Sequence, residues 1–179
     1  MNIKKNNIDN LFLIENSIHK DLRGDFIKTF SNHNLNIKLH KNINIKESFI
    51  SKNKRNVLRG IHVQVNKTKS YKFVTCLNGK ILDVCIDLRK KSKTFLEIYK
   101  NKLESKNNTI MIPPGVGHSF FSISNDSLVL YEISKNYDIK DDISIRYNSI
   151  DFKWPIKNPK LSVRDKKALK LNEFLLKYF

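Results

Sequence analysis

Residues 57–64 carry one histidine midway in a mostly apolar, β-branched run. As a strand, this run would alternate between two faces, one with Leu58, Gly60, His62 and Gln64 and the other with Val57, Arg59, Ile61 and Val63. An imidazole can be neutral near pH 7 and accept a proton there, so His62 is a candidate base. On this stretch alone, a core histidine with satisfied ring nitrogens is the commoner case. The rest of the chain must decide between a reactive and a structural histidine.

A second histidine, His118, follows a turn at residues 113–117 that contains two prolines and two glycines. Because proline fixes its own φ angle, this turn is rigid and delivers His118 at a defined position. Glycine-rich phosphate loops of the P-loop or dinucleotide-binding type are absent from the sequence.

The elements that must position these histidines are short strands. We predict strands at residues 11–18, 26–30, 45–51, 57–64, 71–77, 80–88, 95–103, 109–112, 119–123 and 128–134. Asn78-Gly79 supplies the residues of a type I′ turn, so the strands on either side of it are predicted to form a hairpin. Many short strands at close spacing indicate a sandwich or barrel rather than βαβ units.

Few helices are expected beside these strands. Residues 31–44 are predicted to be a loop with at most one helical turn. A C-terminal helix is predicted from about Asp165, because Leu171, Phe174, Leu175 and Tyr178 fall at helical spacing. With no internal repeat and no linker, residues 1–179 are interpreted as a single domain.

The charge of the chain is strongly positive, with 34 Lys and Arg against 17 Asp and Glu and a formal net charge of +17. This balance suggests an anionic partner, and nucleic acid is the first candidate. The lysines are scattered through every segment, however, and neither a recognition motif nor a basic helix emerges. We therefore expect no nucleic-acid partner, and we expect the charge to assist capture of a small phosphorylated ligand.

The location of the protein can also be predicted. No apolar run approaches the length of a membrane-spanning helix, and the first residues are not followed by the apolar core of a signal peptide. Cys76 and Cys85 fit reduced thiols better than a secreted disulfide framework. A cytoplasmic protein with no membrane partner is predicted.

Six motifs connect these features to a known family. They are residues 21–24 (DLRG), 57–64 (VLRGIHVQ), the strand of Lys72 with 83–89 (DVCIDLR), 112–118 (IPPGVGH), 154–155 (WP) and 161–165 (LSVRD). In this order and spacing, from Leu11 to Lys167, the chain resembles the dTDP-4-dehydrorhamnose 3,5-epimerase family. The resemblance implies a mainly β fold, a cupin-like jelly-roll barrel, here with a short C-terminal helix. It also implies a homodimer whose N-terminal strands cross between subunits.

The implied activity is that of an isomerase, which inverts C3, C5 or both next to the C4 ketone of a nucleotide-diphosphate-linked 4-keto-6-deoxy sugar. Such a reaction needs a base, a group that stabilises the enolate oxygen, and an acid on the opposite face. The matching positions hold His62 as base, Lys72 near the enolate and Tyr131 as acid. Asp165 would orient the imidazole, with Asp83 as the competing partner. The substrate's own ketone makes the proton removable, so we expect no cofactor.

Further positions match ligand-binding residues of the family. Arg23, Arg59, His118 and Arg164 would bind the diphosphate, Tyr137 would stack on the nucleobase, and Asp142 (with Asp141 as the second choice) would lie near the nucleotide. Two departures change the expected ligand contacts. Lys28 replaces a glutamate, and Glu47-Ser48-Phe49 replaces a Gln-x-Asn tripeptide, so Glu47 and Phe49 would meet the ligand instead of two amides.

Several alternatives stay open. The substrate could be a dTDP-linked hexose or a GDP-linked heptose for a capsule or lipopolysaccharide, and inversion could involve C3 alone. A cupin 3,4-ketoisomerase would carry a second histidine two residues after the first, where Gln64 stands. A non-catalytic sugar-binding cupin would need neither Lys72 nor Tyr131. We expect no metal site at His62 and His118, because metal-binding cupins usually carry a His-x-His pair and a nearby glutamate.

Overall fold

Two β-sheets lie face to face in the computed structural model, which describes residues 2–39, 42–104 and 106–178. The six-stranded sheet has the order β1-β2-β10-β7-β12-β5, and the five-stranded sheet has the order β13-β6-β11-β8-β9. Their strands are β1 (Asn2–Lys5), β2 (Phe12–Glu15), β5 (Glu47–Asn53), β6 (Leu58–Gln64), β7 (Lys72–Asn78), β8 (Lys80–Asp87), β9 (Ile98–Glu104), β10 (Asn108–Ile112), β11 (Val116–Ser122), β12 (Ser127–Ile133) and β13 (Asp142–Ser144). The mainly β, jelly-roll prediction is confirmed.

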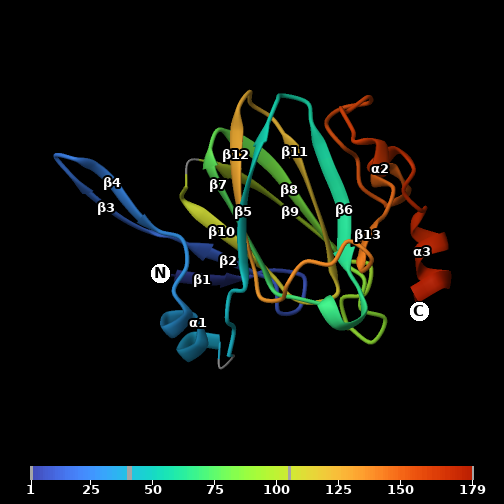
Figure 1. Cartoon of the computed structure of the whole chain (residues 1–179), viewed down its shortest axis with the longest axis horizontal. Coiled ribbons are helices and arrows are strands. Elements are labelled where there is room, and N and C mark those ends of the chain that lie inside the picture. The colour runs from blue at the N-terminus through green and yellow to red at the C-terminus, as the bar shows by residue number, and fades with distance from the viewer. Residues whose placement is uncertain (1, 40–41, 105, 179) are drawn as a thin grey trace.

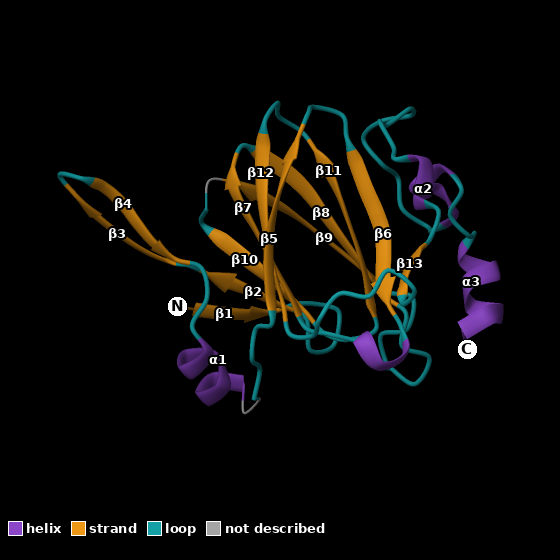
Figure 2. Ribbon diagram, in the orientation of Figure 1, coloured by secondary structure: helices purple, strands orange, loops and turns teal. Residues whose placement is uncertain are grey.

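The helices lie on the outer faces of the two sheets (Figure 2). They are α1 (Asn32–Leu39), α2 (Val163–Lys166) and α3 (Leu171–Tyr178), with short 3₁₀ turns η1 (Asn66–Thr68) and η2 (Tyr147–Ser149). Leu35 of α1 packs with Phe12, Phe73 and Met111 on the outer face of the six-stranded sheet. On the outer face of the other sheet, Phe174 of α3 is fully buried, and the predicted C-terminal helix is confirmed from Leu171 onward. The loop prediction for 31–44 missed α1, since its polar sequence shows little helical periodicity.

The main core lies between the two sheets. Its buried members come from strands of both sheets and include Val74, Ile81, Cys85, Ile110, Phe120 and Val129. Cys76 and Cys85 belong to this core and are both free thiols, as predicted. Because alternate residues of each strand point inward, the same pattern that builds this core can also place polar side chains inside the barrel.

The predicted hairpin at Asn78-Gly79 is wrong. β7 pairs with β10 and β12 in the six-stranded sheet, whereas β8 pairs with β9 and β11 in the other sheet. Gly79 has a φ of +78°, but Asn78 is not in the positive-φ region, so the connection is not a type I′ turn. Val74 of β7 and Ile81 of β8 both belong to the core between the sheets. Crossing from one sheet to the other lets the two strands bury their apolar faces against each other.

The predicted strand at 11–18 is divided in two. β2 joins the six-stranded sheet, and after Asn16 the chain turns into a separate hairpin of β3 (Ser17–Asp21) and β4 (Gly24–Lys28). This hairpin projects away from both sheets as an arm (Figure 1). The amide of Asn16 is held by the carbonyl of Lys106, which fixes the point where the arm leaves the barrel.

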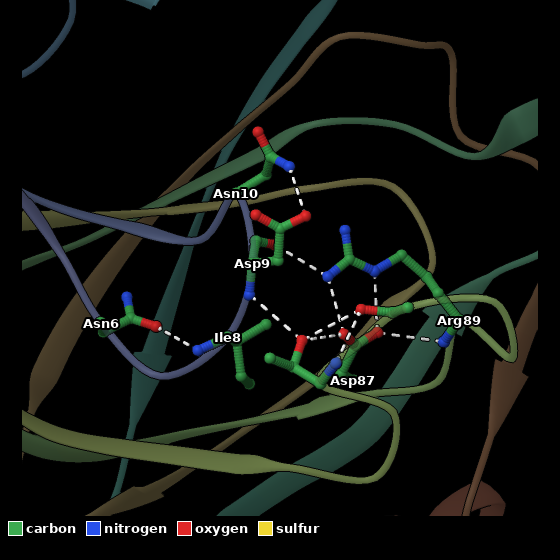
Figure 3. A network of polar contacts seen from close by, with 8 residues as sticks. Asn6, Ile8, Asp9, Asn10, Asp87 and Arg89 are labelled. Atoms are coloured by element: carbon green, nitrogen blue, oxygen red, sulfur yellow. Dashed lines mark hydrogen bonds and ion pairs between the residues drawn. The ribbon is translucent and has the colours of Figure 1, made fainter.

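A buried carboxylate connects the N-terminal loop to the end of β8 (Figure 3). Asp87 is fully buried and accepts two hydrogen bonds from the guanidinium of Arg89, each 2.7 Å long. The hydroxyl of Thr94 donates to the same carboxylate, and Arg89 also donates to the carbonyl of Asp9. Burial opposes ionisation, but these donors outweigh it and lower the pKa of Asp87. We call Asp87, Arg89, Thr94 and the carbonyl of Asp9 the Asp87 clasp.

The helices of the described ranges are short. None of them is both long enough and apolar enough to cross a bilayer.

Candidate active site

A cavity of about 470 Å³ opens between the inner faces of the two sheets. Strands β5, β7 and β12 contribute to it from one sheet and β6 and β11 from the other, together with residues near β13. The lining residues are Phe49, Ile50, Ser51, Lys52, Arg59, His62, Gln64, Lys72, His118, Phe120, Tyr131, Ile133, Tyr137 and Asp142. The structure thus brings eight of the predicted site residues to one cavity.

His62 faces this cavity and is held from behind by Asp165. The Nε2 atom of His62 lies 2.7 Å from Oδ1 of Asp165, a carboxylate that is only 5% exposed. Asp165 also accepts hydrogen bonds from the hydroxyl of Ser144 and the backbone of Gly60. Burial disfavours its charge, yet these donors and the imidazole lower its pKa. An ionised Asp165 fixes the Nε2–H tautomer, which leaves the lone pair on Nδ1 of the imidazole.

Local distortion of β6 aims a second side chain into the cavity. Opposite β11, the four residues from Arg59 to His62 face the three residues from His118 to Phe120, so β6 contains a bulge. The bulge places Arg59 on the cavity side, and the alternation predicted for residues 57–64 is therefore wrong at Arg59. Gly60 has a φ of +103°, and a Cβ there would lie 2.5 Å from the carbonyl oxygen of His118, so only glycine fits.

His118 forms a second imidazole–carboxylate pair, directly opposite His62 in the sheet. Its Nε2 lies 2.6 Å from Oδ2 of Asp83, and both side chains are buried. Burial lowers the pKa of His118 more than Asp83 raises it, so this imidazole is neutral at pH 7. Asp83 is thus the partner of His118, and Asp165 is the partner of His62.

Lys72 brings a cation to the cavity from the opposite sheet. It begins β7 and pairs in register with Ile112 and Ile133. Within the described ranges, its ammonium makes no ion pair and no hydrogen bond. Burial lowers its pKa, while the charge of Asp142 acts in the other direction. An ammonium without a protein partner is available to a ligand oxygen.

Tyr131 lines the same cavity from β12. Its ring stacks on Phe49, with centroids 4.9 Å apart and planes 18° apart, and it meets the ring of His118 edge-on. Phe49 is its register partner on β5. The Tyr131 side chain hydrogen-bonds with Ser51, and burial raises its pKa. Tyr131 is therefore a neutral phenol that can donate a proton at pH 7.

The mouth of the cavity carries a cluster of polar residues. Arg164 donates to the carboxylate of Asp142 at 2.8 Å, and the hydroxyl of Tyr137 donates to the same carboxylate at 3.2 Å. Glu47 accepts the backbone N–H of Tyr137 at 2.8 Å and lies outside the cavity lining. Arg59 is held by the side-chain oxygen of Asn53 at 2.6 Å.

Arg23 lies apart from this site. It is at the exposed tip of the arm, where its guanidinium pairs with Asp21 at 2.6 Å. The expectation that Arg23 binds the ligand is not met within one chain, because the arm projects away from the barrel (Figure 1).

Sequence reasoning missed several lining residues that strand alternation could have found. Ser51 follows Glu47 and Phe49 on one face of β5, and Phe120 and Ile133 follow His118 and Tyr131 in the same way. Ile50 and Lys52 also line the cavity but lie outside this pattern. In the part of the chain that the structure describes, no cluster of three or more His, Cys, Asp or Glu side chains could hold a metal ion.

A family profile and the similar curated proteins carry the same description. Residues 5–173 match the profile of the family described as dTDP-4-dehydrorhamnose 3,5-epimerase. The chain is 31% identical to the protein of that name from Salmonella typhimurium over 180 residues, which cover 98% of each chain.

Solved structures extend this comparison. A 3,5-epimerase from Legionella pneumophila in complex with dTDP-4-keto-L-rhamnose has a TM-score of 0.90 and 30% identity, covering 96% of this chain and 93% of that one. A 3'-monoepimerase from Streptomyces bikiniensis in complex with dTDP-quinovose has a TM-score of 0.87 and 26% identity, covering 93% and 86%.

Proposed function

The chain belongs to the dTDP-4-dehydrorhamnose 3,5-epimerase family and is an isomerase, and we propose that it inverts C3, C5 or both in a nucleotide-diphosphate-linked 4-keto-6-deoxy sugar. The observation that carries this proposal is the His62–Asp165 pair, 2.7 Å apart, with the imidazole facing a cavity that also contains Lys72 and Tyr131. A base, a cation and a neutral phenol are the three groups that such an inversion needs.

In the first step, Nδ1 of His62 removes the proton from the carbon next to the ketone. Asp165 accepts the Nε2–H bond and stabilises the imidazolium that forms. The electron pair moves to the C4 oxygen, where the ammonium of Lys72 neutralises the developing enolate. The cavity lies between the sheets, so its reduced exposure to water strengthens this interaction.

In the second step, Tyr131 returns a proton from the opposite face of the sugar. His62 comes from the five-stranded sheet and Tyr131 from the six-stranded sheet, so the two groups approach a bound ring from different sides. Because burial keeps the phenol neutral, it can donate its proton to the enolate carbon. Inversion results because removal and return occur on different faces.

The arginines and the mouth of the cavity would hold the rest of the ligand. Arg59 and Arg164 supply fixed donors for the diphosphate, and Tyr137 and Asp142 would contact the nucleotide. His118 is buried with its Nε2 on Asp83, so we propose that its Nδ1 accepts a sugar hydroxyl in place of a diphosphate contact. Relatives bound to dTDP-sugars support the sugar-nucleotide class.

The nucleotide and the sugar are the finer part of the proposal. Phe49 presents an apolar ring to the cavity, and Glu47 is used to hold the segment at Tyr137. Neither residue offers the ligand an amide. The two candidate substrates are therefore a dTDP-linked hexose and a GDP-linked heptose. The 3'-monoepimerase among the structural neighbours supports C3-only inversion as a second outcome.

A homodimer would complete the site with Arg23. A two-stranded hairpin is marginally stable alone, yet the arm exposes Leu22 and Phe26, the latter to 67%. We propose that the arm packs on a second copy of the chain and brings Arg23 to the cavity of that copy. Dimer formation would then bury the apolar side chains and supply a third arginine for the diphosphate.

Free, buried cysteines support a reducing compartment, so we place the reaction in the cytoplasm. Its product would serve the synthesis of sugars for a capsule or lipopolysaccharide.

Solvent exchange tests the reaction and its regiochemistry together. The enzyme is incubated in deuterium oxide with dTDP- and GDP-linked 4-keto-6-deoxy sugars in parallel, and each carbon is followed by NMR. Label and inversion at C3, C5 or both support the proposal and identify the nucleotide. A 3-keto product would instead indicate a ketoisomerase. Binding with no label at any carbon would indicate a sugar-binding protein and overturn the proposal.

A further inference from the structure

Gln64 is a buried polar residue of the cavity that the mechanism above does not use. It ends β6, two residues after His62 and on the same face, and it is 7% exposed. Its register partner on β13 is Asp142. The carboxylate of Asp142 is already occupied by Arg164 and Tyr137, so it does not compete for the amide of Gln64.

Ser70 determines how this amide is oriented. The hydroxyl of Ser70, itself only 7% exposed, donates to Oε1 of Gln64. With the carbonyl end held, the NH₂ end carries the remaining hydrogen-bonding capacity. Within residues 2–39, 42–104 and 106–178, Nε2 of Gln64 has no hydrogen-bond partner. Nε2 is not among the fully buried polar atoms that lack a partner in the described residues, so it is open to the cavity and available to a ligand oxygen.

The distance along β6 relates this donor to the base. Residues two apart on a strand lie roughly 7 Å apart, which is about the width of a sugar ring. A sugar whose reacting carbon faces His62 would therefore present a neighbouring ring oxygen substituent to Gln64. Lys72 approaches from the other sheet, so the neutral amide and the ammonium would meet different parts of the ring.

We propose that Gln64 is a substrate-orienting residue, whose Nε2–H donates to a hydroxyl or keto oxygen of the sugar beside the carbon that His62 deprotonates. Ser70 is the positioning residue that holds the amide in this orientation. This inference rests on the proposed function, since it assigns the ligand of Gln64 to the sugar of the same substrate.

Three variants separate donation from a merely structural role. Gln64→Met keeps the volume but removes both polar ends, and we expect kcat/KM to fall about 10- to 100-fold. Gln64→Glu keeps an acceptor for Ser70 but loses the donor. If Gln64 only anchored Ser70, this variant would keep wild-type activity; we expect it to lose at least as much as Gln64→Met. Ser70→Ala should lose several-fold, and combined with Gln64→Met it should add no further loss.

Two readouts keep these outcomes distinct. Binding of dTDP alone, measured by calorimetry, should stay within about twofold of wild type in Gln64→Met, because the nucleotide has no sugar for the amide to contact. Wild-type kcat/KM in Gln64→Met or Gln64→Glu would overturn the role of Gln64 and leave the epimerase proposal standing. Absence of exchange in the wild-type enzyme with every keto sugar would overturn both.

Discussion

Two imidazole–carboxylate pairs lie side by side in the barrel, and their surroundings give them different chemistry. The side chain of His62 is 27% exposed and its ring faces the cavity, whereas His118 is only 4% exposed. Burial lowers the pKa of His118, which keeps it neutral, while Nε2 of His62 lies 2.7 Å from the carboxylate of Asp165. At the scale of single residues, exposure separates the proposed base, His62, from the proposed hydroxyl acceptor, His118.

Removing the base should abolish label exchange. We expect His62→Asn to lose exchange at every carbon, by about 100-fold or more, because the other histidine of the cavity, His118, is only 4% exposed and its Nε2 is paired with Asp83. NMR in deuterium oxide measures this directly. The matched control is His33→Asn, since His33 is an exposed residue of α1 outside the site. Label incorporation at the wild-type rate in His62→Asn would exclude His62 as the base.

Removing the phenol should separate exchange from inversion. In Tyr131→Phe, proton removal by His62 survives but the proton is no longer delivered to the opposite face. We therefore expect label at the reacting carbon with retained configuration, and net inversion reduced by about 100-fold. Tyr147→Phe is the control, because Tyr147 lies on the C-terminal segment and bonds the carbonyl of Lys157. Inversion at the wild-type rate would remove Tyr131 from the mechanism.

At the scale of elements, sequence patterns identified strands but not their partners. β12 alternates regularly between two faces, which its sequence makes predictable, whereas β6 departs from alternation at Arg59. The turn at Asn78-Gly79 was misinterpreted because local turn chemistry does not specify which sheet a strand joins. The bulge that re-aims Arg59 depends on pairing with β11, which the sequence of β6 alone does not contain.

In the candidate site, too, positions along one strand were predictable from the sequence, whereas contacts between distant segments were not. The joint position of His62 and Gln64 follows from alternation along one strand. The contact between His62 and Asp165 spans 103 residues, and only the family resemblance indicated it. The contact between Asp83 and His118 depends on the pairing of β8 with β11, which places Asp83 opposite Phe120. The sequence does not specify this pairing.

The Asp87 clasp connects two elements, and its contribution to the stability of the fold depends on pH. It ties the N-terminal loop to the loop after β8, and Asp87→Asn should destabilise the fold by about 2 kcal/mol at pH 7 by weakening charge-assisted hydrogen bonds. Urea unfolding measures the difference between wild type and variant.

The sign of the pH dependence follows from the lowered pKa of Asp87. A carboxyl whose folded pKa is below its unfolded value of roughly 4 stabilises the fold fully above that value. The contribution is lost as pH falls through the lower, folded pKa. The wild-type advantage over Asp87→Asn should therefore be constant from about pH 7 to 5 and shrink below about pH 4. An advantage that grows on acidification would contradict this assignment.

At the scale of the whole molecule, the exposed arm and the distant Arg23 are the basis of the proposed site shared between two chains. The arm pairs only with itself in the described structure and carries the exposed ring of Phe26. If the arm of one subunit packs on the other, Phe26→Asp should shift the protein toward monomer in size-exclusion chromatography with light scattering, since a charge would be buried in the interface. An unchanged dimer would place the interface elsewhere.

Mixing two variants with different defects tests whether the site is shared. In a heterodimer of His62→Asn and Arg23→Ala chains, the cavity of the Arg23→Ala chain keeps its own His62 and receives an intact Arg23 from its partner. The other cavity lacks both groups. Random reassociation of an equal mixture should therefore restore about one quarter of wild-type activity, because half of the dimers are mixed and each contains one complete site. Each variant reassociated alone is the control. If Arg23 acted within its own chain, both cavities of the heterodimer would keep one defect and mixing would restore nothing.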